Sequence, residues 1–430
     1  MIKKYILIIT SLLLVSVNCF SQEQLTLSDA INIGLENNYN IRIAKKDLEV
    51  SSENNSWSNV GRFPTIDVGV TSVNRFDNTE TADITTNNLI PSAQLNWTLF
   101  NGFKIFNNKK KLDDIYNLTK GNVAIVVENN IESIILAYYN VLLQKEKLNV
   151  FTEVEKLSKD RYDRALMSRE IGSSITYEVL QAKNSWLEDR STQLSQKLNV
   201  DNSIRALNLL IGETSDKSYD FVDDFKAETN DYLLEDLTKK MFESNKTLKN
   251  QYFNQLISER NVDIAGGDFY PTLRLNSGYD YESANQQINS LPRTNSKSYD
   301  YYANVTLSWN IFNGLNSRRA LEVAKIESEI SKIEADQIEH SLTNTLTQLF
   351  ELYKVRKELL NVADENMEAA KLNLQISEEK FKNGSISSFN YRDVQIIFLN
   401  AAVGKLNAIY NLKETDTELA RLTGSIISEN

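Results

Sequence analysis

The sequence predicts a mostly α-helical chain that also contains β-strands and is built from two tandem copies of one long unit. Three observations support this prediction. A short motif occurs twice, as NWTLFNG at Asn96–Gly102 and SWNIFNG at Ser308–Gly314, with its tryptophans 212 residues apart. Apolar residues recur every 3.5 positions over long stretches without proline, which is typical of coiled-coil packing. Four other segments alternate apolar and polar residues, as half-buried strands do.

The repeat extends far beyond this motif. The same offset relates Gly172 to Gly384, whereas an offset of 207 relates Phe63-Pro64-Thr65 to Tyr270-Pro271-Thr272. Solenoid repeats are about 20–50 residues long, so a unit this long is interpreted as a duplicated half-domain. The predicted organisation is a signal peptide at 1–21, a first repeat at 22–212, a linker at 213–233, a second repeat at 234–424 and a tail at 425–430.

The N-terminus has the pattern of a secretory signal peptide. Lys3 and Lys4 precede an apolar run at 5–17, and Cys19-Phe20-Ser21 resembles a cleavage site with small residues. The run is shorter than the roughly 20 residues that span a bilayer. We expect cleavage after Ser21 and export of a protein without cysteine. Lipid attachment at Cys19, the single cysteine of the chain, is the alternative.

Each copy is expected to open with a shorter helix, at about 28–59 and 235–266, and to close with two long ones. The first long helices, at about 104–169 and 317–382, would each be roughly 100 Å in length, and the returning helices would run at about 175–211 and 388–423. The four prolines all lie outside these long stretches. In the second copy the apolar seam comprises Leu342, Leu346, Leu349, Tyr353, Leu360, Ala363, Met367, Ala370 and Leu374, with Arg356 at the one skipped position.

The four alternating segments are predicted strands of about 10 residues, the length of a transmembrane strand. They are centred on Ile66–Val70, Ala93–Leu99, Leu273–Tyr281 and Ala303–Ile311. An ordinary sheet on a soluble core would show the same alternation. In lipid, the four strands of one chain leave open edges, so two chains would have to close 8 strands or three chains 12. Aromatic residues expected at a membrane interface are Trp97, Phe100, Trp309 and Phe312, with Phe103, Tyr299, Tyr301 and Tyr302 also placed near strand ends.

Glycine and serine mark the turns between the paired long helices. These turns are Gly172-Ser173-Ser174 and Gly384-Ser385-Ile386-Ser387. Glycine permits the positive φ that ends a helix, and serine is suited to cap the next one.

Composition argues against several classes of function. The chain has 47 Lys and Arg against 58 Asp and Glu, a net charge of −11, which disfavours binding to nucleic-acid phosphates. His340 is the only histidine, so no His/Cys cluster for zinc is expected. Phosphate-binding loops and the Gly-x-Ser-x-Gly nucleophile motif are absent from the sequence. We therefore expect no enzyme activity, cofactor or metal site.

Together these features resemble the TolC-like outer-membrane efflux protein family, also called outer membrane factors. The resemblance rests on the duplicated helix–strand–strand–helix–helix unit, the strand ends at Trp97–Gly102 and Trp309–Gly314, and Gly172 followed by Glu178-Val179-Leu180-Gln181-Ala182, which is similar to the D-V-L-x-A helix of the family. It covers about residues 24–424.

The resemblance implies a homotrimer whose chains close a 12-stranded barrel in the outer membrane and an α-helical periplasmic tunnel. It also implies that the helix turns dock a periplasmic adaptor, which joins the duct to an inner-membrane transporter. By resemblance the docking residues are Gly172, Ser173, Ser174, Phe381, Gly384, Ser385 and Ser387, and the gate candidates are Arg169, Glu170 and Asp393. Arg169 and Ile175 depart from the aromatic and serine positions of the family pattern.

Two classes of function remain from the sequence. The first is a passive exit duct for efflux or type I secretion in the outer membrane of a Gram-negative bacterium. The second is an exported helical scaffold or rod without channel activity. Four alternating strands of membrane length favour the duct, because a rod has no use for them. Dependence on detergent would separate the two.

Overall fold

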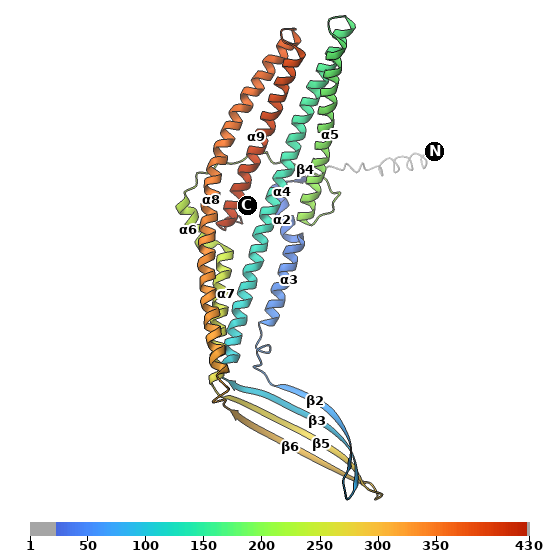
Figure 1. The fold of residues 1–430 in the computed structure, drawn as a ribbon, viewed down its shortest axis with the longest axis vertical. Coiled ribbons are helices and arrows are strands. Elements are labelled where there is room, and N and C mark those ends of the chain that lie inside the picture. The colour runs from blue at the N-terminus through green and yellow to red at the C-terminus, as the bar shows by residue number, and fades with distance from the viewer. Residues whose placement is uncertain (1–22, 428–430) are drawn as a thin grey trace, which may run out of the picture. The chain divides into compact units, whose positions relative to one another are not determined.

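The computed structural model describes residues 23–427 and confirms the predicted fold class. The predicted signal peptide, with Cys19, lies outside the described residues. Two copies of one element order follow each other along the chain (Figure 1). The first comprises α2 (Leu27–Asn37), α3 (Tyr39–Asn54), β2 (Thr65–Asn78), β3 (Asp83–Asn101), α4 (Lys104–Glu170) and α5 (Thr176–Ile211). The second comprises α6 (Leu234–Ser244), α7 (Lys246–Gly266), β5 (Thr272–Ile288), β6 (Thr294–Ser308), α8 (Asn316–Lys382) and α9 (Ser388–Leu422).

The chain divides into two compact units. One contains the described residues up to Arg42, Val127–Lys239 and the chain from Leu346 onward; the other contains Ile43–Val126 and Lys240–Thr345. In the first unit, hereafter the hairpin unit, α4 with α5 and α8 with α9 form two long helical hairpins that lie side by side (Figure 1). The second, hereafter the sheet unit, holds the four-stranded sheet, α7, and the parts of α3, α4 and α8 nearest to it in sequence.

The short opening helices are interrupted, which corrects the prediction of single helices at 28–59 and 235–266. Asn38 separates α2 from α3, and Asn245, 207 residues later, separates α6 from α7. The Asn38 Oδ1 accepts hydrogen bonds from the Asn40 and Ile41 amides at 2.8 and 3.2 Å, and the Asn245 Oδ1 accepts one from the Leu248 amide at 2.9 Å. Each asparagine therefore caps the second helix and separates it from the first.

The linker at 213–233 contains a strand that the sequence did not predict. β4 (Tyr219–Phe221) pairs in parallel with β1 (Glu23–Leu25). The Tyr138 hydroxyl donates a hydrogen bond to the Asp223 carboxylate at 2.6 Å and also lies 2.9 Å from the Leu25 carbonyl. Leu25, Tyr138 and Phe221 belong to the core of the hairpin unit. Strands of three residues are too short to show a period, so tertiary contacts place them.

The predicted seam of α8 is buried where it passes through the hairpin unit. Leu346, Leu349, Tyr353, Leu360, Ala370 and Leu374 are each at most 8% exposed. Arg356 occupies the skipped position and points its guanidinium at α9, where Nη1 donates to the Asn411 carbonyl at 2.6 Å and to Glu414 at 2.9 Å. The seam thus accommodates an arginine because Nη1 of its guanidinium is bonded to α9.

The repeated Asn-Gly marks where strand passes into helix. Gly102 and Phe103 have φ of 69° and 65°, and Gly314 and Leu315 have φ of 67° and 66°. Two consecutive left-handed residues reverse the chain before α4 and α8 begin. The repeated tryptophans fix this corner in the same way in both copies, because the indole Nε1 of Trp97 donates to the Arg62 carbonyl at 3.0 Å and that of Trp309 to the Phe269 carbonyl at 3.1 Å.

Candidate functional site

The sheet unit contains one antiparallel sheet with the strand order β2-β3-β5-β6. Its register places apolar residues of all four strands on one face, because directly paired residues point to the same side. Val68 pairs with Ala93, Ala93 with Tyr279 and Tyr279 with Tyr301, while Leu275 pairs with both Trp97 and Val305. The opposite face is polar, and its paired rows include Asp67 with Gln94, Asn96 with Asn276 and Asn304, and Ser92 with Asp280 and Asp300.

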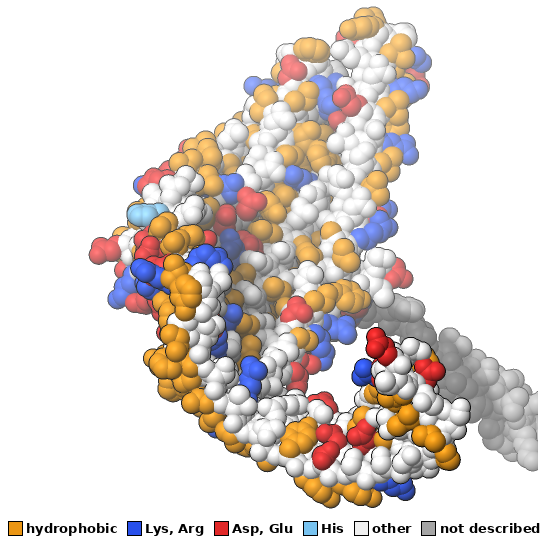
Figure 2. All heavy atoms as spheres, turned by 60° about the horizontal axis from the view of Figure 1, so that its bottom comes forward, with side chains coloured by type: hydrophobic (Ala, Val, Ile, Leu, Met, Phe, Trp, Pro, Cys, Tyr) orange, Lys and Arg blue, Asp and Glu red, His pale blue; other side chains and the backbone are white. Residues whose placement is uncertain are grey.

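The apolar face of the sheet is not covered by any part of the described chain. Val68 is 81% exposed, Val305 64% and Leu307 68%. Figure 2 shows hydrophobic side chains along the outer edge of the curved sheet and acidic ones on its inner side. A soluble core would bury these residues, and a continuous exposed apolar patch of this kind marks a surface that contacts another apolar phase.

The strands are longer than the predicted 10 residues, at 14, 19, 17 and 15 residues for β2, β3, β5 and β6. The additional residues are polar on both faces, as in Thr85–Asn88, Ser283–Gln287 and Thr294–Ser298. Alternation reports only the part of a strand with one apolar face, so the polar extensions escaped the sequence pattern. For the same reason Tyr299, Tyr301 and Tyr302 lie within β6 rather than at its end.

The four predicted interface aromatics lie at the end of the sheet where strands pass into helices. Trp97 and Phe100 are in the last part of β3, and Trp309 and Phe312 follow β6. Phe100 packs edge-on against Phe103 with ring centroids 5.1 Å apart. Trp309 and Phe312 are 61% and 76% exposed, while the indole nitrogens of both tryptophans are hydrogen-bonded. Aromatic rings that expose apolar atoms while their polar nitrogen is hydrogen-bonded are suited to a membrane interface.

The two helix turns of the hairpin unit, hereafter the tips, have the same backbone geometry. Gly172 and Gly384 have φ of 80° and 70°. The Ser173 amide donates to the Ser168 carbonyl at 2.8 Å, and the Ser385 amide donates to the Lys380 carbonyl at 2.7 Å. This is the glycine-ended helix stop in which an amide donates to the carbonyl five residues earlier. Gly172, Ser173, Gly384, Ser385 and Ser387 are exposed, while Ser174 and Phe381 are partly buried.

Serine caps only the second returning helix. The Ser387 Oγ accepts from the Asn390 amide at 3.1 Å, but the N-cap of α5 is Ile175, which makes no side-chain cap, so the predicted capping is wrong for the first tip. There the Ser174 hydroxyl instead donates to Glu178 at 2.5 Å. Phe381 stacks on Tyr391 with centroids 4.7 Å apart, whereas Arg169, its counterpart, is exposed.

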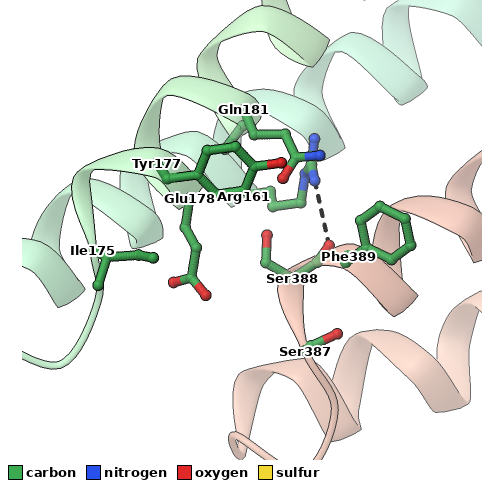
Figure 3. A pocket seen from close by; sticks show the side chains of 9 residues that line it. Arg161, Ile175, Tyr177, Glu178, Gln181, Ser387, Ser388 and Phe389 are labelled. Carbon is green, nitrogen blue, oxygen red and sulfur yellow. Dashed lines mark hydrogen bonds between the residues drawn. The ribbon is translucent and has the colours of Figure 1, made fainter.

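A groove lies between the two tips. One part, of about 520 Å³, is lined by residues of both turns, including Met167, Ser173, Ser174, Phe381, Gly384 and Ser387. The adjoining part, of about 340 Å³, is lined by Arg161, Ile175, Tyr177, Glu178, Gln181, Ala182, Ser387, Ser388 and Phe389 (Figure 3). The structure thus brings predicted docking residues from both turns to one groove. Ile171, Ile175, Tyr177 and Phe389 expose apolar side chains around it.

In the part of the chain that the structure describes, the gate candidates form no hydrogen bond or ion pair with one another. Arg169 and Glu170 are exposed in the last turn of α4, and Asp393 is exposed on α9. Arg392, next to Asp393 in the sequence, forms a bidentate ion pair with Asp189 of α5, with Nη–O distances of 2.6 and 2.8 Å. Arg161 of α4 is 3% exposed and donates from Nη1 to the Ser388 carbonyl at 3.3 Å.

Sequence reasoning missed these three buried charged residues. A signal for Arg161 exists, because Val154, Ser158, Arg161 and Ala165 are buried at steps of four, three and four. A charged residue in the seam of a long helix indicates a polar contact inside the bundle. Asp189 and Arg392 lie in separate helices with no pattern linking them, so only the fold brings them together.

The positive φ of the tip glycines can be tested by substitution. Nothing lies within 4 Å of a Cβ added to Gly384, so Gly384→Ala is expected to destabilise only through its positive φ, by about 1–2 kcal/mol. Ser385→Ala in the same turn is the control and is expected to change stability by less than about 0.5 kcal/mol. Thermal unfolding of the purified protein measures both. Equal stability of the two variants would contradict the assigned turn geometry.

The described residues contain no group of three or more His, Cys, Asp or Glu placed to hold a metal ion. Among the helices of residues 23–427, none combines the length and the apolar character needed to cross a bilayer.

Comparison with known proteins follows the same division into copies. The family model described as "Outer membrane efflux protein" matches residues 30–213 and 237–425. A search of curated proteins finds no match. Among solved structures, CusC superposes with a TM-score of 0.76 at 16% identity, covering 93% of this chain and 92% of that one. The outer membrane channel CmeC of Campylobacter jejuni gives 0.75 at 18% identity, covering 93% and 85%.

The outer membrane channel MtrE of Neisseria gonorrhoeae, solved in its open state, gives a TM-score of 0.72 at 15% identity and covers 93% of this chain and 89% of that one. These likenesses show a common fold over nearly the whole described chain. Both copies are matched by one family model, which together spans well over half of the residues. This chain belongs to the outer membrane efflux protein family.

Proposed function

We propose that this protein is the outer-membrane exit duct of a tripartite efflux system, in which three copies form one channel. In this proposal the duct conducts substrates passively from a periplasmic adaptor and an inner-membrane transporter to the exterior. Type I secretion would use the same duct with a different transporter. The exposed apolar face of the four-stranded sheet is the observation that carries the proposal.

The directions of the strands suit closure by several copies. Neighbours in the order β2-β3-β5-β6 are all antiparallel, so the two outer strands run in opposite directions. β6 of one copy can therefore continue the antiparallel pattern with β2 of the next. Closure would satisfy the backbone groups of both outer strands, which lipid does not tolerate unpaired. The family fold favours three copies and 12 strands over two copies and 8.

The helices of the hairpin unit present matching surfaces for neighbouring copies. α4 and α9 contact each other in the middle, where Lys413 lies 5.2 Å from the Tyr139 ring and Arg421 pairs with Glu132 at 2.8 Å. The outer helices carry uncovered apolar stripes at heptad-like spacing. On α5 these are Tyr177, Leu180, Leu187, Leu194 and Leu198, and on α8 they are Leu352, Val355, Leu359 and Val362, all more than a third exposed.

The inner helix α4 lacks such a stripe within the hairpin unit. Between Val127 and Glu170, α4 leaves only one large apolar residue exposed, Met167 next to its tip. Packing α5 of one copy against α8 of the next would bury both stripes in coiled-coil fashion. The helices would then close a tunnel, and the tips would dock the adaptor.

The first experiment is the mass of the mature protein extracted from the outer-membrane fraction, measured by light scattering with the detergent contribution subtracted. A mass near three chains, with little protein in the soluble fraction, is expected because the apolar sheet face must be covered. A monodisperse soluble monomer would refute the duct and leave an exported helical rod. Conductance across planar bilayers by the same preparation then tests for an open path.

A further inference from the structure

The smaller part of the groove between the tips contains a buried cation that the chain does not neutralise. Arg161 is 3% exposed, and only its Nη1 is used, in the bond to the Ser388 carbonyl. Its Nε and Nη2 are buried and have no hydrogen-bond partner in the described part of the chain. Burial, and then the positive charge of Arg392, lower the pKa of Arg161 to about 10. The side chain is still a cation at neutral pH.

The charges around Arg161 do not balance. The negative charge of Asp189 acts on Arg161, but both carboxylate oxygens of Asp189 are already held by Arg392. Glu178 is the only carboxylate that lines the pocket, and it accepts a hydrogen bond from Ser174 at the start of α5. Two arginines therefore share one buried aspartate. Leaving a buried charge without a partner is strongly unfavourable.

The free atoms of Arg161 have the geometry of a carboxylate-binding fork. Nε and Nη2 lie on one edge of the planar guanidinium and present two parallel N–H donors, the arrangement that bonds both oxygens of a carboxylate. Figure 3 shows the guanidinium beside Gln181, with its hydrogen bond to the Ser388 carbonyl at the start of α9. Hydroxyl groups of Tyr177, Ser387 and Ser388 also line the pocket.

We propose that the Arg161 pocket takes an aspartate or glutamate side chain of the periplasmic adaptor, as the charged anchor of docking. The proposal rests on the duct function proposed above. Exposed Ile175, Tyr177 and Phe389 surround the pocket entrance and would contact apolar residues beside that carboxylate. A charged pair shielded by apolar neighbours is the arrangement expected of a strong interface contact.

Replacing Arg161 is expected to weaken adaptor binding without lowering the melting temperature. Arg161→Met removes an unneutralised buried charge and keeps a long apolar side chain, so the purified trimer is expected to melt no lower than the unaltered protein. The same change is expected to weaken adaptor binding by about tenfold or more, because the partner carboxylate would be buried alone. Arg161→Lys keeps the charge but loses the fork and should also weaken binding. Arg190→Met, on an exposed part of α5, is the matched control and should not.

The test begins with a photo-crosslinking amino acid at Phe389, introduced into the full chain in its native host. Mass spectrometry identifies the cross-linked adaptor segment, and each Asp or Glu in it is changed to its amide. Affinities between purified trimer and adaptor then give a double-mutant cycle. The proposal expects Arg161→Met and one amide variant to weaken binding separately, and the combination to weaken it no further.

The other outcomes are distinguishable. Two outcomes would show that Arg161 is not the docking anchor, although the adaptor is still cross-linked to the tips. One is that Arg161→Met binds the adaptor normally. The other is that Arg161→Met melts well below the unaltered protein. Absence of adaptor cross-links from both Phe389 and Ile386 would refute docking at the tips itself. A thermal shift with sodium phosphate or acetate that needs Arg161, without coupling to any adaptor carboxylate, would show a site for free anions and likewise overturn the proposal.

Discussion

Val305→Arg is expected to remove most of the protein from the outer membrane. Val305 lies on the apolar face of β6, pairs with Leu275 and is 64% exposed. In the proposed barrel this face meets lipid, where an arginine near the midplane costs about 2–4 kcal/mol. Because each of three copies carries the change, the cost to the assembly would be a multiple of that figure. Immunoblots of outer-membrane fractions and of native gels measure the loss of trimer.

The neighbouring residue supplies the control. Asn304 is also exposed but points to the polar face, where it pairs with Asn276. Asn304→Arg adds the same side chain to the same strand and is expected to leave trimer yield nearly unchanged, because this face would line a water-filled channel. If the two variants assembled equally well, the assignment of the faces to lipid and water would be wrong.

The faces of the sheet, and most of the fold, were predictable because their residues repeat with a simple period. Alternation at Ala93–Leu99 and Ala303–Ile311 located β3 and β6, although β6 ends at Ser308 rather than Ile311. Steps of three and four from Leu346 to Leu374 located the buried side of α8. Both periods follow from backbone geometry alone. Duplication strengthened each assignment, because Trp97 and Trp309, or Gly172 and Gly384, give the same result twice.

What escaped prediction depends on single residues and tertiary contacts. Asn38 and Asn245 separate the opening helices through one side-chain cap each. β1 and β4 are stabilised by the core around Tyr138 rather than by any repeat of their own. At the tips, sequence identified the glycine turns, but the groove arises from two hairpins brought together by the fold. Arg161 was therefore not distinguished from the many other charges on α4.

The ion pair beneath the tips leads to the second large effect. Asp189 and Arg392 side chains are 8% and 13% exposed and join α5 to α9. Asp189→Ala is expected to destabilise the hairpin unit by about 3–5 kcal/mol, because breaking a buried pair leaves an uncompensated charge. The effect should lie at the upper end, since Arg392 and Arg161 would then face each other without any shared aspartate.

Removing the other partner is expected to cost less. In Arg392→Met, Asp189 keeps a cationic neighbour, because the free Nε and Nη2 of Arg161 remain close enough to influence it. The double variant Asp189→Leu with Arg392→Met replaces the pair by apolar side chains and should recover most of the lost stability, as buried pairs often can be replaced in this way.

Thermal unfolding in detergent gives the order of the melting temperatures. The expected order, from lowest to highest, is Asp189→Ala, Arg392→Met, the double variant and the unaltered protein. A melting temperature for Arg392→Met below that of Asp189→Ala would show that Arg161 does not share the charge of Asp189, and would remove the charge imbalance on which its role as a docking anchor depends.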